Sequence, residues 1–197
     1  YAARYIARCG FQQVSGAIGF RDRLQDSVSL IGAVPDDVRE FLIECASHQF
    51  AHGDVMHWWH EPYTGVRTHI CDDKLFLPYA AVEYVERTGD ESVLAESAYY
   101  LADKKIPHGE HSVYACMEQG EEKDTLRGHI MRAFRSVELS ERGLVLMGTG
   151  DWNDGMDKVG ENGHGESVWC SMFAYYVAGR FLPYADESDR VYLAELR

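Results

Sequence analysis

The chain has 197 residues, and its 19 Lys and Arg against 32 Asp and Glu give a formal net charge of −13. Because a phosphate backbone is bound through Lys and Arg, this charge argues against a general nucleic-acid surface and leaves room only for a local basic pocket. With 46% hydrophobic and 26% charged residues, the composition excludes a disordered chain. No apolar run reaches the roughly 20 residues that cross a bilayer, so we expect no contact with a membrane.

The five cysteines are odd in number and far apart, and none of them forms a C-x-x-C pair. A disulfide framework is expected in a much smaller, more Cys-dense secreted chain. We therefore predict reduced thiols, most of them buried, and a cytoplasmic protein.

The two ends of the chain both have helical spacing. Tyr1, Tyr5, Ile6 and Cys9 share a helical face, and residues 191–197 stop inside another helix-like pattern. No interdomain linker lies between them, so we expect residues 1–197 to be part of one domain that is truncated at both ends.

Between the ends the dominant period is helical. Pro35 with its two following acids suits a helix start, and Asp90 is placed to cap another helix. Apolar residues recur at helical spacing over residues 38–46, 74–85, 93–101, 126–137 and 168–182. No stretch alternates with period two over more than a few residues, so the sequence predicts an all-α fold.

Two of these helices, residues 74–85 and 168–182, are apolar almost all round, whereas the others carry a single apolar stripe. Such a mixture indicates two concentric layers, in which the outer helices cover the inner ones. Three Gly-rich polar stretches interrupt the helices, and loops of this kind are where a site would lie. They span residues 15–26, 53–73 and 148–166.

The third loop, MGTGDWNDGMDKVGENGHGES, places acids around Trp152. A carboxyl group beside an aromatic wall has a raised pKa and can donate a proton near neutral pH. A calcium loop fails on register, because aligning Gly155 with its invariant glycine puts Gly150 and Trp152 where oxygen ligands are required. A solvated acidic turn is the alternative.

The second loop contains HWWHEPY and follows two further histidines, His48 and His52. Their spacing matches no zinc signature, so we predict no metal. The flat faces of Trp58 and Trp59 suit sugar rings, with core packing as the alternative. In the first loop Arg21 and Asp22 offer hydrogen bonds to several hydroxyl groups, with surface ion pairs as the alternative.

Taken together, the motifs SGAIGFRDRLQDS, GDVMHWWHEPYTGVRTHICDDKLFLPYAAVEYVERTGDESVL and MGTGDWNDGMDKVGENGHGESVW closely resemble glycoside hydrolase family 94, from about residue 15 to residue 173. That family contains cellobiose and related disaccharide phosphorylases, β-1,2-oligoglucan phosphorylases and a domain of cyclic β-1,2-glucan synthetases. The resemblance implies a partial (α/α)6 barrel, about two-thirds of the toroid, with long active-site loops. Residues 1–197 would then be part of this catalytic domain, truncated at both ends.

The resemblance also implies roles for single residues. Asp154, the second Asp of the D-W-N-D motif, is the general acid. Trp152 lines the subsite of the reacting sugar, whose hydroxyl groups Asp22 holds with support from Arg21. Arg67, Asp72 and Asp73 match family positions in the substrate pocket, and Trp58 and Glu166 are further candidates for substrate binding.

In the implied reaction protonated Asp154 donates to the glycosidic oxygen while inorganic phosphate attacks the anomeric carbon from the opposite face and inverts it. Such a glycoside phosphorylase, a hexosyltransferase, needs phosphate as co-substrate and no other cofactor. The cellobiose-type members carry an Arg where this chain has Gly16, which favours the β-1,2-glucan branch. The expected partners are an oligosaccharide, phosphate and the remainder of the parent polypeptide, and a homodimer is left open.

Two alternatives remain at this stage. An inverting glucan hydrolase would need a second carboxylate about 6.5–9.5 Å from Asp154, with Glu166, Asp22 and Asp72 as candidates. A non-catalytic sugar-binding or chain-length domain of a cyclic glucan synthetase would use Asp154 only as a hydrogen-bond partner.

Overall fold

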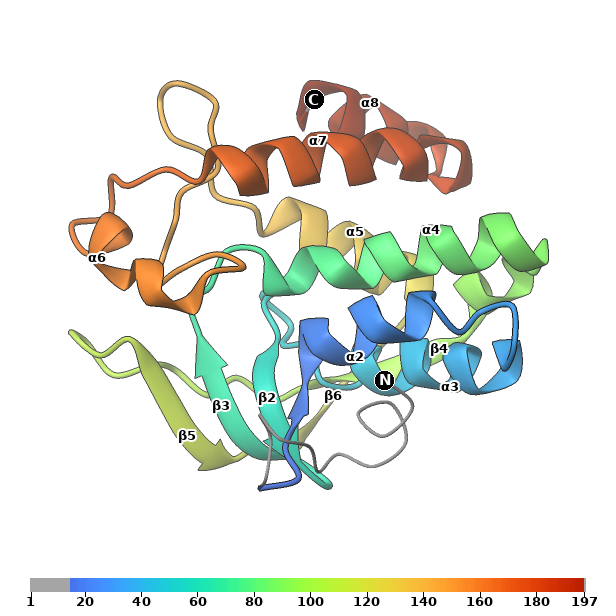
Figure 1. The fold of residues 1–197 in the computed structure, drawn as a ribbon, viewed down its shortest axis with the longest axis horizontal. Coiled ribbons are helices and arrows are strands. Elements are labelled where there is room, and N and C mark those ends of the chain that lie inside the picture. The colour runs from blue at the N-terminus through green and yellow to red at the C-terminus, as the bar shows by residue number, and fades with distance from the viewer. Residues whose placement is uncertain (1–14, 197) are drawn as a thin grey trace.

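The computed structural model describes residues 15–196, and these combine packed helices with two antiparallel sheets (Figure 1). The helices are α2 (Phe20–Val28), α3 (Pro35–Ala46), α4 (Phe76–Thr88), α5 (Leu126–Arg135), α6 (Asp157–Gly160), α7 (Val168–Phe181) and α8 (Glu187–Leu196), with the 3-10 turns η1 (Asp73–Leu75), η2 (Glu91–Ala95), η3 (Asp154–Met156) and η4 (Leu182–Tyr184). The larger sheet has the order β1 (Ile18–Gly19), β2 (Met56–His60), β3 (Thr64–Thr68) and β5 (Ser112–Cys116). The smaller sheet pairs β4 (Ser97–Leu101) with β6 (Gln119–Thr125).

The prediction of an all-α fold, and with it of an all-helical partial (α/α)6 barrel, is therefore wrong. The described residues form a mixed α/β fold, and the segment predicted as the second loop contains the hairpin of β2 and β3. A register shift between Met56 and Trp58 interrupts the alternation of β2. The strand β6, with the sequence QGEEKDT, has no buried residue. Neither strand could therefore give a period-two hydrophobic pattern.

Four of the five predicted helices are confirmed as α3, α4, α5 and α7. The helix predicted after Asp90 is wrong beyond Ala95. The side chain of Asp90 does accept a hydrogen bond from the backbone N–H of Ser92, but only the short turn η2 follows, and the chain then pairs with β6. The predicted first loop is also wrong in part, because α2 begins at Phe20. The helical spacing of Tyr1 to Cys9 lies outside the described residues.

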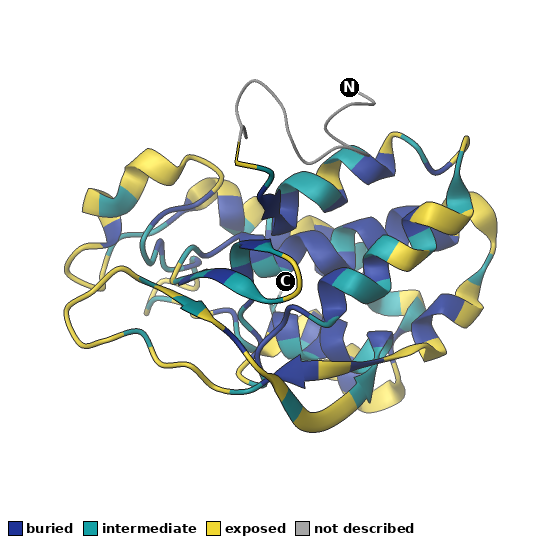
Figure 2. Ribbon diagram, turned by 90° about the horizontal axis from the view of Figure 1, so that it is seen from below, coloured by how far each residue is buried: buried dark blue, intermediate teal, exposed yellow. Residues whose placement is uncertain are grey.

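The helix α4 lies at the centre of the helical layer and contacts α2, α3, α5 and α7 (Figure 1). Apart from Tyr79, every residue from Phe76 to Val85 is buried. Figure 2 shows the same division, with buried residues inside the helical layer and exposed residues at the margin. The prediction that this helix is covered on most sides is confirmed, and its N-terminal end carries η1 into the candidate site.

The helix α7, whose sequence is apolar almost all round, is covered on one face only. Cys170, Ala174 and Val177 are buried, whereas an apolar face remains exposed, with Met172 at 65% exposure. The exposed residues of this face are Val168, Trp169, Met172, Tyr175 and Tyr176. An apolar sequence all round a helix therefore did not predict burial all round it. Among the described residues, no helix has both the length and the apolar character needed to span a bilayer.

Candidate functional site

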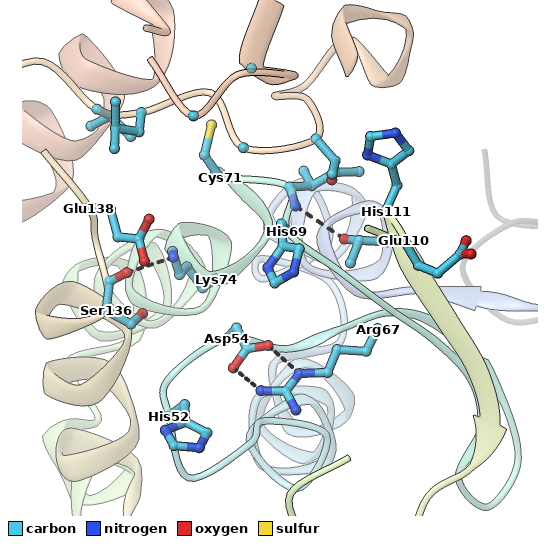
Figure 3. Close-up of a pocket in the computed structure, with 18 of the residues that line it drawn as sticks. His52, Asp54, Arg67, His69, Cys71, Lys74, Glu110, His111, Ser136 and Glu138 are labelled. Carbon is cyan, nitrogen blue, oxygen red and sulfur yellow. Dashed lines mark hydrogen bonds and ion pairs between the residues drawn. The ribbon is translucent and has the colours of Figure 1, made fainter. Parts of the chain in front are cut away.

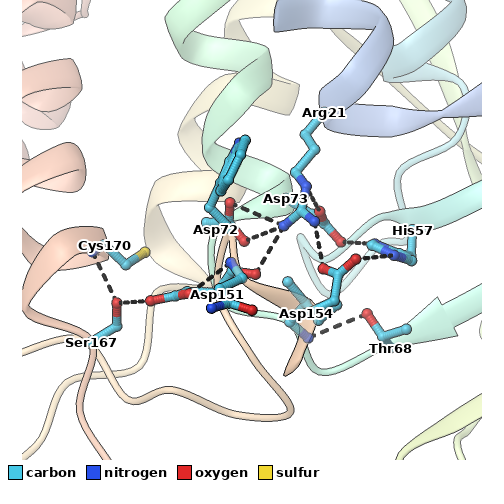
Figure 4. Close-up of polar contacts among 12 residues, drawn as sticks. Arg21, His57, Thr68, Asp72, Asp73, Asp151, Asp154, Ser167 and Cys170 are labelled. Atoms are coloured by element: carbon cyan, nitrogen blue, oxygen red, sulfur yellow. Dashed lines mark hydrogen bonds and ion pairs between the residues drawn. The ribbon is translucent and has the colours of Figure 1, made fainter. Parts of the chain in front are cut away.

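Charged side chains from four separate segments meet around one arginine, and we call this group the Arg21 cluster (Figure 4). Arg21 comes from α2, His57 from β2, and Asp72 and Asp73 from the start of η1, while Asp151 and Asp154 come from the segment before α6. The cluster thus unites the first helix of the described chain with the D-W-N-D segment.

Arg21 holds the cluster together through its guanidinium group, whose side chain is only 9% exposed. Nη1 donates to both carboxylate oxygens of Asp72, at 3.1 and 3.3 Å, and to the backbone oxygen of Asp151 at 2.9 Å. Nη2 donates to Asp154. Burial lowers the pKa of Arg21, but the carboxylates of Asp73, Asp72 and Asp154 more than offset this and raise it. The group therefore stays cationic.

The two acids of η1 have different partners. Asp72 is fully buried, and burial together with the neighbouring Asp73 raises its pKa to about 8, although Arg21 acts in the opposite direction. Asp73 Oδ2 forms a hydrogen bond with His57, at 2.8 Å from Nδ1. Its other oxygen, Oδ1, is buried and has no hydrogen-bond partner among the described residues. Asp73 Oδ1 thus pairs with Arg21 by charge alone, at 3.7 Å from Nε.

His57 lies where the register of β2 shifts, between Met56 and Trp58, and its side chain points toward the cluster (Figure 4). Its ring lies between two carboxylates, with Nε2 at 3.9 Å from Oδ2 of Asp154 (Figure 4). Burial lowers the pKa of His57, but the hydrogen bond to Asp73 and the charges of Asp73 and Asp154 outweigh this and raise it. Its charged form is therefore stabilised in the folded chain.

The D-W-N-D segment is anchored at Asp151 and open at Asp154. Asp151 Oδ1 accepts from the backbone N–H of Asn153 at 2.9 Å, and Oδ2 accepts from Ser167 Oγ at 2.6 Å. Ser167 in turn caps α7. The side chain of Asp154 is 57% exposed, and Trp152 donates from Nε1 to Gln25 Oε1 at 3.2 Å. An anchored loop thus presents one accessible carboxyl group and one exposed indole ring.

Gly148 fixes where this segment runs, and its replacement by Ala should destabilise the fold. Its φ is +60°, and a Cβ atom there would lie 1.9 Å from the backbone oxygen of His69. A left-handed residue costs about 1–2 kcal/mol, and the clash adds about 1–3 kcal/mol. We expect Gly148→Ala to lower the free energy of unfolding by about 2–5 kcal/mol, measured by urea denaturation.

The matched control is Gly143→Ala. Gly143 has a φ of +77°, but a Cβ atom added there would meet nothing within 4 Å. The free energy of unfolding of this variant should therefore fall only by the cost of a left-handed residue, about 1–2 kcal/mol. Equal losses in the two variants would show that the contact between Gly148 and His69 does not hold the segment.

Asp22, Glu166 and Trp58, also predicted for the site, each have a neighbour outside the Arg21 cluster. A Cβ atom on Gly19 would lie 2.1 Å from Asp22 Oδ2, so this carboxylate turns back over the N-terminus of α2. Glu166 forms an ion pair with Arg142, whose Nε lies 3.1 Å from Oε1. The Trp58 ring packs beside Tyr114, at 5.8 Å between centroids.

Arg67, also predicted for the site, lines a separate cavity of about 780 Å³ (Figure 3). Its Nε and Nη2 donate to Asp54 at 2.6 and 2.8 Å, and Nη1 donates to Asp103 at 2.7 Å. No member of the Arg21 cluster is among the described residues that line this cavity. Three of its lining residues, Cys71, Lys74 and Thr149, lie close in sequence to members of the cluster. Its volume is that of a ligand pocket.

Sequence reasoning missed the part that His57 and Asp151 play in the cluster. In the sequence, His57 of the HWWHEPY motif suggested only a metal ligand, and Asp151 was only one of several acids around Trp152. Over the part of the chain that the structure describes, no group of three or more His, Cys, Asp or Glu side chains is arranged to hold a metal. The presence of a histidine and several acids did not by itself reveal which of them meet.

Comparison with known proteins agrees with the motifs. Residues 1–195 match the family model of the glycosyl hydrolase 94 superfamily, catalytic domain. The chain is 39% identical over 186 residues to cyclic beta-(1,2)-glucan synthase NdvB of Rhizobium meliloti (strain 1021), covering 92% of this chain and 6% of that protein. It is 30% identical over 175 residues to solabiose phosphorylase of Paenibacillus borealis, covering 87% of this chain and 20% of that protein.

A second protein of Paenibacillus borealis, 3-O-beta-D-glucopyranosyl-beta-D-glucuronide phosphorylase, is 22% identical over 174 residues. This match covers 85% of the chain and 20% of the relative. The chain thus spans a fifth or less of the length of these relatives. The family match nevertheless covers nearly every residue, and the chain belongs to the catalytic domain of the glycosyl hydrolase 94 superfamily.

Proposed function

We propose that the chain carries the general acid of a glycoside phosphorylase that acts on β-linked gluco-oligosaccharides, with inorganic phosphate as the nucleophile. The observation that carries this proposal is the exposed carboxyl group of Asp154 on a loop held by Arg21 and Asp151. A β-1,2-glucan is the favoured substrate. The similarity to a cyclic beta-(1,2)-glucan synthase supports this choice, as does Gly16 in place of the arginine of cellobiose-type members.

In this proposal Asp154 donates its proton to the glycosidic oxygen as the bond from that oxygen to the anomeric carbon breaks. Phosphate forms the new bond from the opposite face, so the configuration inverts and α-glucose 1-phosphate is released. The exposed ring of Trp152 offers an apolar surface to a sugar face. Asp73 Oδ1 is buried and accepts no hydrogen bond from the described residues. It is therefore a further candidate acceptor for a hydroxyl group of the sugar.

Asp22, next to Arg21 in the first turn of α2, remains a proposed contact for the hydroxyl groups of the sugar. The other predicted substrate contacts are not part of this proposal. Glu166 is paired with Arg142, and Trp58 packs against Tyr114. Arg67 uses its guanidinium to hold Asp54 and Asp103 at the wall of the cavity, so its proposed role is to shape that cavity. Asp72, fully buried and bound to Arg21, holds the arginine rather than a sugar.

The decisive assay measures glucose 1-phosphate released from a β-1,2-gluco-oligosaccharide by the complete natural polypeptide, with and without phosphate. We expect release that depends on phosphate and is slower with cellobiose. Release of free glucose without phosphate would instead indicate a hydrolase. Binding of the oligosaccharide with no turnover would indicate a non-catalytic sugar-binding domain.

A further inference from the structure

His57 occupies a position between an anchoring carboxylate and the proposed proton donor. Asp73 Oδ2 lies 2.8 Å from Nδ1, and Asp154 Oδ2 lies 3.9 Å from Nε2. The imidazole side chain is 18% exposed, and that of Asp73 is 3% exposed. The ring is thus held at one nitrogen by a buried group, while its other nitrogen faces an accessible one (Figure 4).

The anchor fixes which nitrogen can exchange a proton. A buried carboxylate at hydrogen-bond distance from Nδ1 keeps a proton on that nitrogen, in both the neutral and the charged ring. Proton gain and loss then occur at Nε2, the atom nearest to Asp154. Oriented in this way, the imidazole can hold one proton beside a carboxylate that the Arg21 guanidinium keeps in place.

We propose that His57 is a positioning residue that stores, on Nε2, the proton that Asp154 delivers to the glycosidic oxygen. This inference rests on the proposed function. In the step, Nε2 and Asp154 Oδ2 first close from 3.9 Å to hydrogen-bond distance as the substrate binds, and the Nε2–H bond of the imidazolium then breaks as an O–H bond forms on Asp154. That O–H bond then breaks as the proton passes to the leaving oxygen. His57 ends neutral with its proton on Nδ1, Asp154 ends as a carboxylate, and a proton from water restores the imidazolium.

The charged groups that face His57 come from three elements packed around β2. Asp73 approaches from η1, Asp154 from η3 and Arg21 from α2, whereas the neighbouring strand β1 consists of Ile18 and Gly19. On the strand β3, Arg67 is bound to Asp54. Two carboxylates against one guanidinium favour the imidazolium, and this agrees with the raised pKa of His57.

The test is the pH dependence of kcat/KM for glucose 1-phosphate release by the complete polypeptide carrying His57→Gln. In the natural protein activity should fall as the pH rises through the titration of His57, above the ordinary value of about 6.5. Without the imidazole this store of the proton is lost, so the fall in activity should begin at lower pH. We expect the alkaline limb to move to lower pH by at least about one unit, with KM nearly unchanged.

Two further variants keep the test decisive. His60→Gln is the control, because His60 lies on the same strand but bonds to the backbone oxygen of Ser15 at 3.0 Å. Its profile should be that of the natural protein. Asp73→Asn leaves the imidazole but weakens its anchor, and should move the same limb in the same direction. If His57→Gln does not fold, an unmoved limb in Asp73→Asn overturns the proposal.

The outcomes also separate this inference from the proposed function. An unshifted profile in a folded His57→Gln enzyme overturns the role of His57, while the function stands if Asp154→Asn still lowers release by about 10²–10⁴-fold. Full turnover in Asp154→Asn overturns the assignment of the acid itself, and the role of His57 falls with it.

Discussion

Replacing Asp154 by Asn should reduce glycosidic-bond cleavage by the complete polypeptide by about 10²–10⁴-fold, the usual contribution of a general acid. An amide keeps the shape of the side chain and can still accept a hydrogen bond from Arg21 Nη2, but it has no acidic proton to give. Because the side chain is 57% exposed, its replacement should leave the fold intact. Sugar affinity should stay within about tenfold, or roughly 1.4 kcal/mol.

Asp157→Asn is the matched control for this variant. Asp157 lies in the same acidic segment, at the start of α6, but outside the Arg21 cluster. The two variants change net charge equally, so only a specific role of Asp154 can separate their turnover. Unchanged turnover in Asp154→Asn would remove this residue from the mechanism, and loss of sugar binding instead would make it a recognition residue.

Most helices were predictable because their apolar residues recur at helical spacing. The strands were not, because the alternation of buried and exposed residues is interrupted in β2 and absent in β6. In α4 the apolar residues alone located the helix, and nearly all of them are buried. The strand β6 forms its hydrogen bonds with β4 through backbone groups that every residue type carries, while its side chains remain polar. Its sequence therefore contains no local sign of pairing.

The candidate site was predictable in its single residues but not in its contacts. The motifs identified Asp154 and Arg21, which lie 133 positions apart, by resemblance rather than by local chemistry. The contact between His57 and Asp73 spans 16 positions and depends on the hairpin that the sequence did not predict. Arg21 enters the cluster from the first turn of α2, a segment that the sequence predicted as a loop. Side-chain direction, which decides function here, follows from the helix start and the strand register.

Replacing Arg21 by Met should have the largest effect on stability, because it removes the one cation that Asp72, Asp73 and Asp154 share. Removing one partner of a buried ion pair costs about 3–5 kcal/mol, since the other charge remains buried. Arg23→Met is the control. Arg23 lies on the same helix, but its partner Glu44 is 31% exposed and can be hydrated when left alone. Urea denaturation should show a clearly smaller loss for the control.

The loss in Arg21→Met should also depend on pH in a defined direction. The pKa of Asp72 in the folded chain, about 8, exceeds the ordinary value of about 3.9 that it regains on unfolding. Without Arg21, which lowers it, this pKa should rise further. The folded state then binds the extra proton, so its stability is retained at low pH and lost as the pH rises through the folded pKa. The deficit against the natural chain should therefore be smaller at pH 5 than at pH 8, and a deficit independent of pH would mean that the buried charge of Asp72 is not its cause.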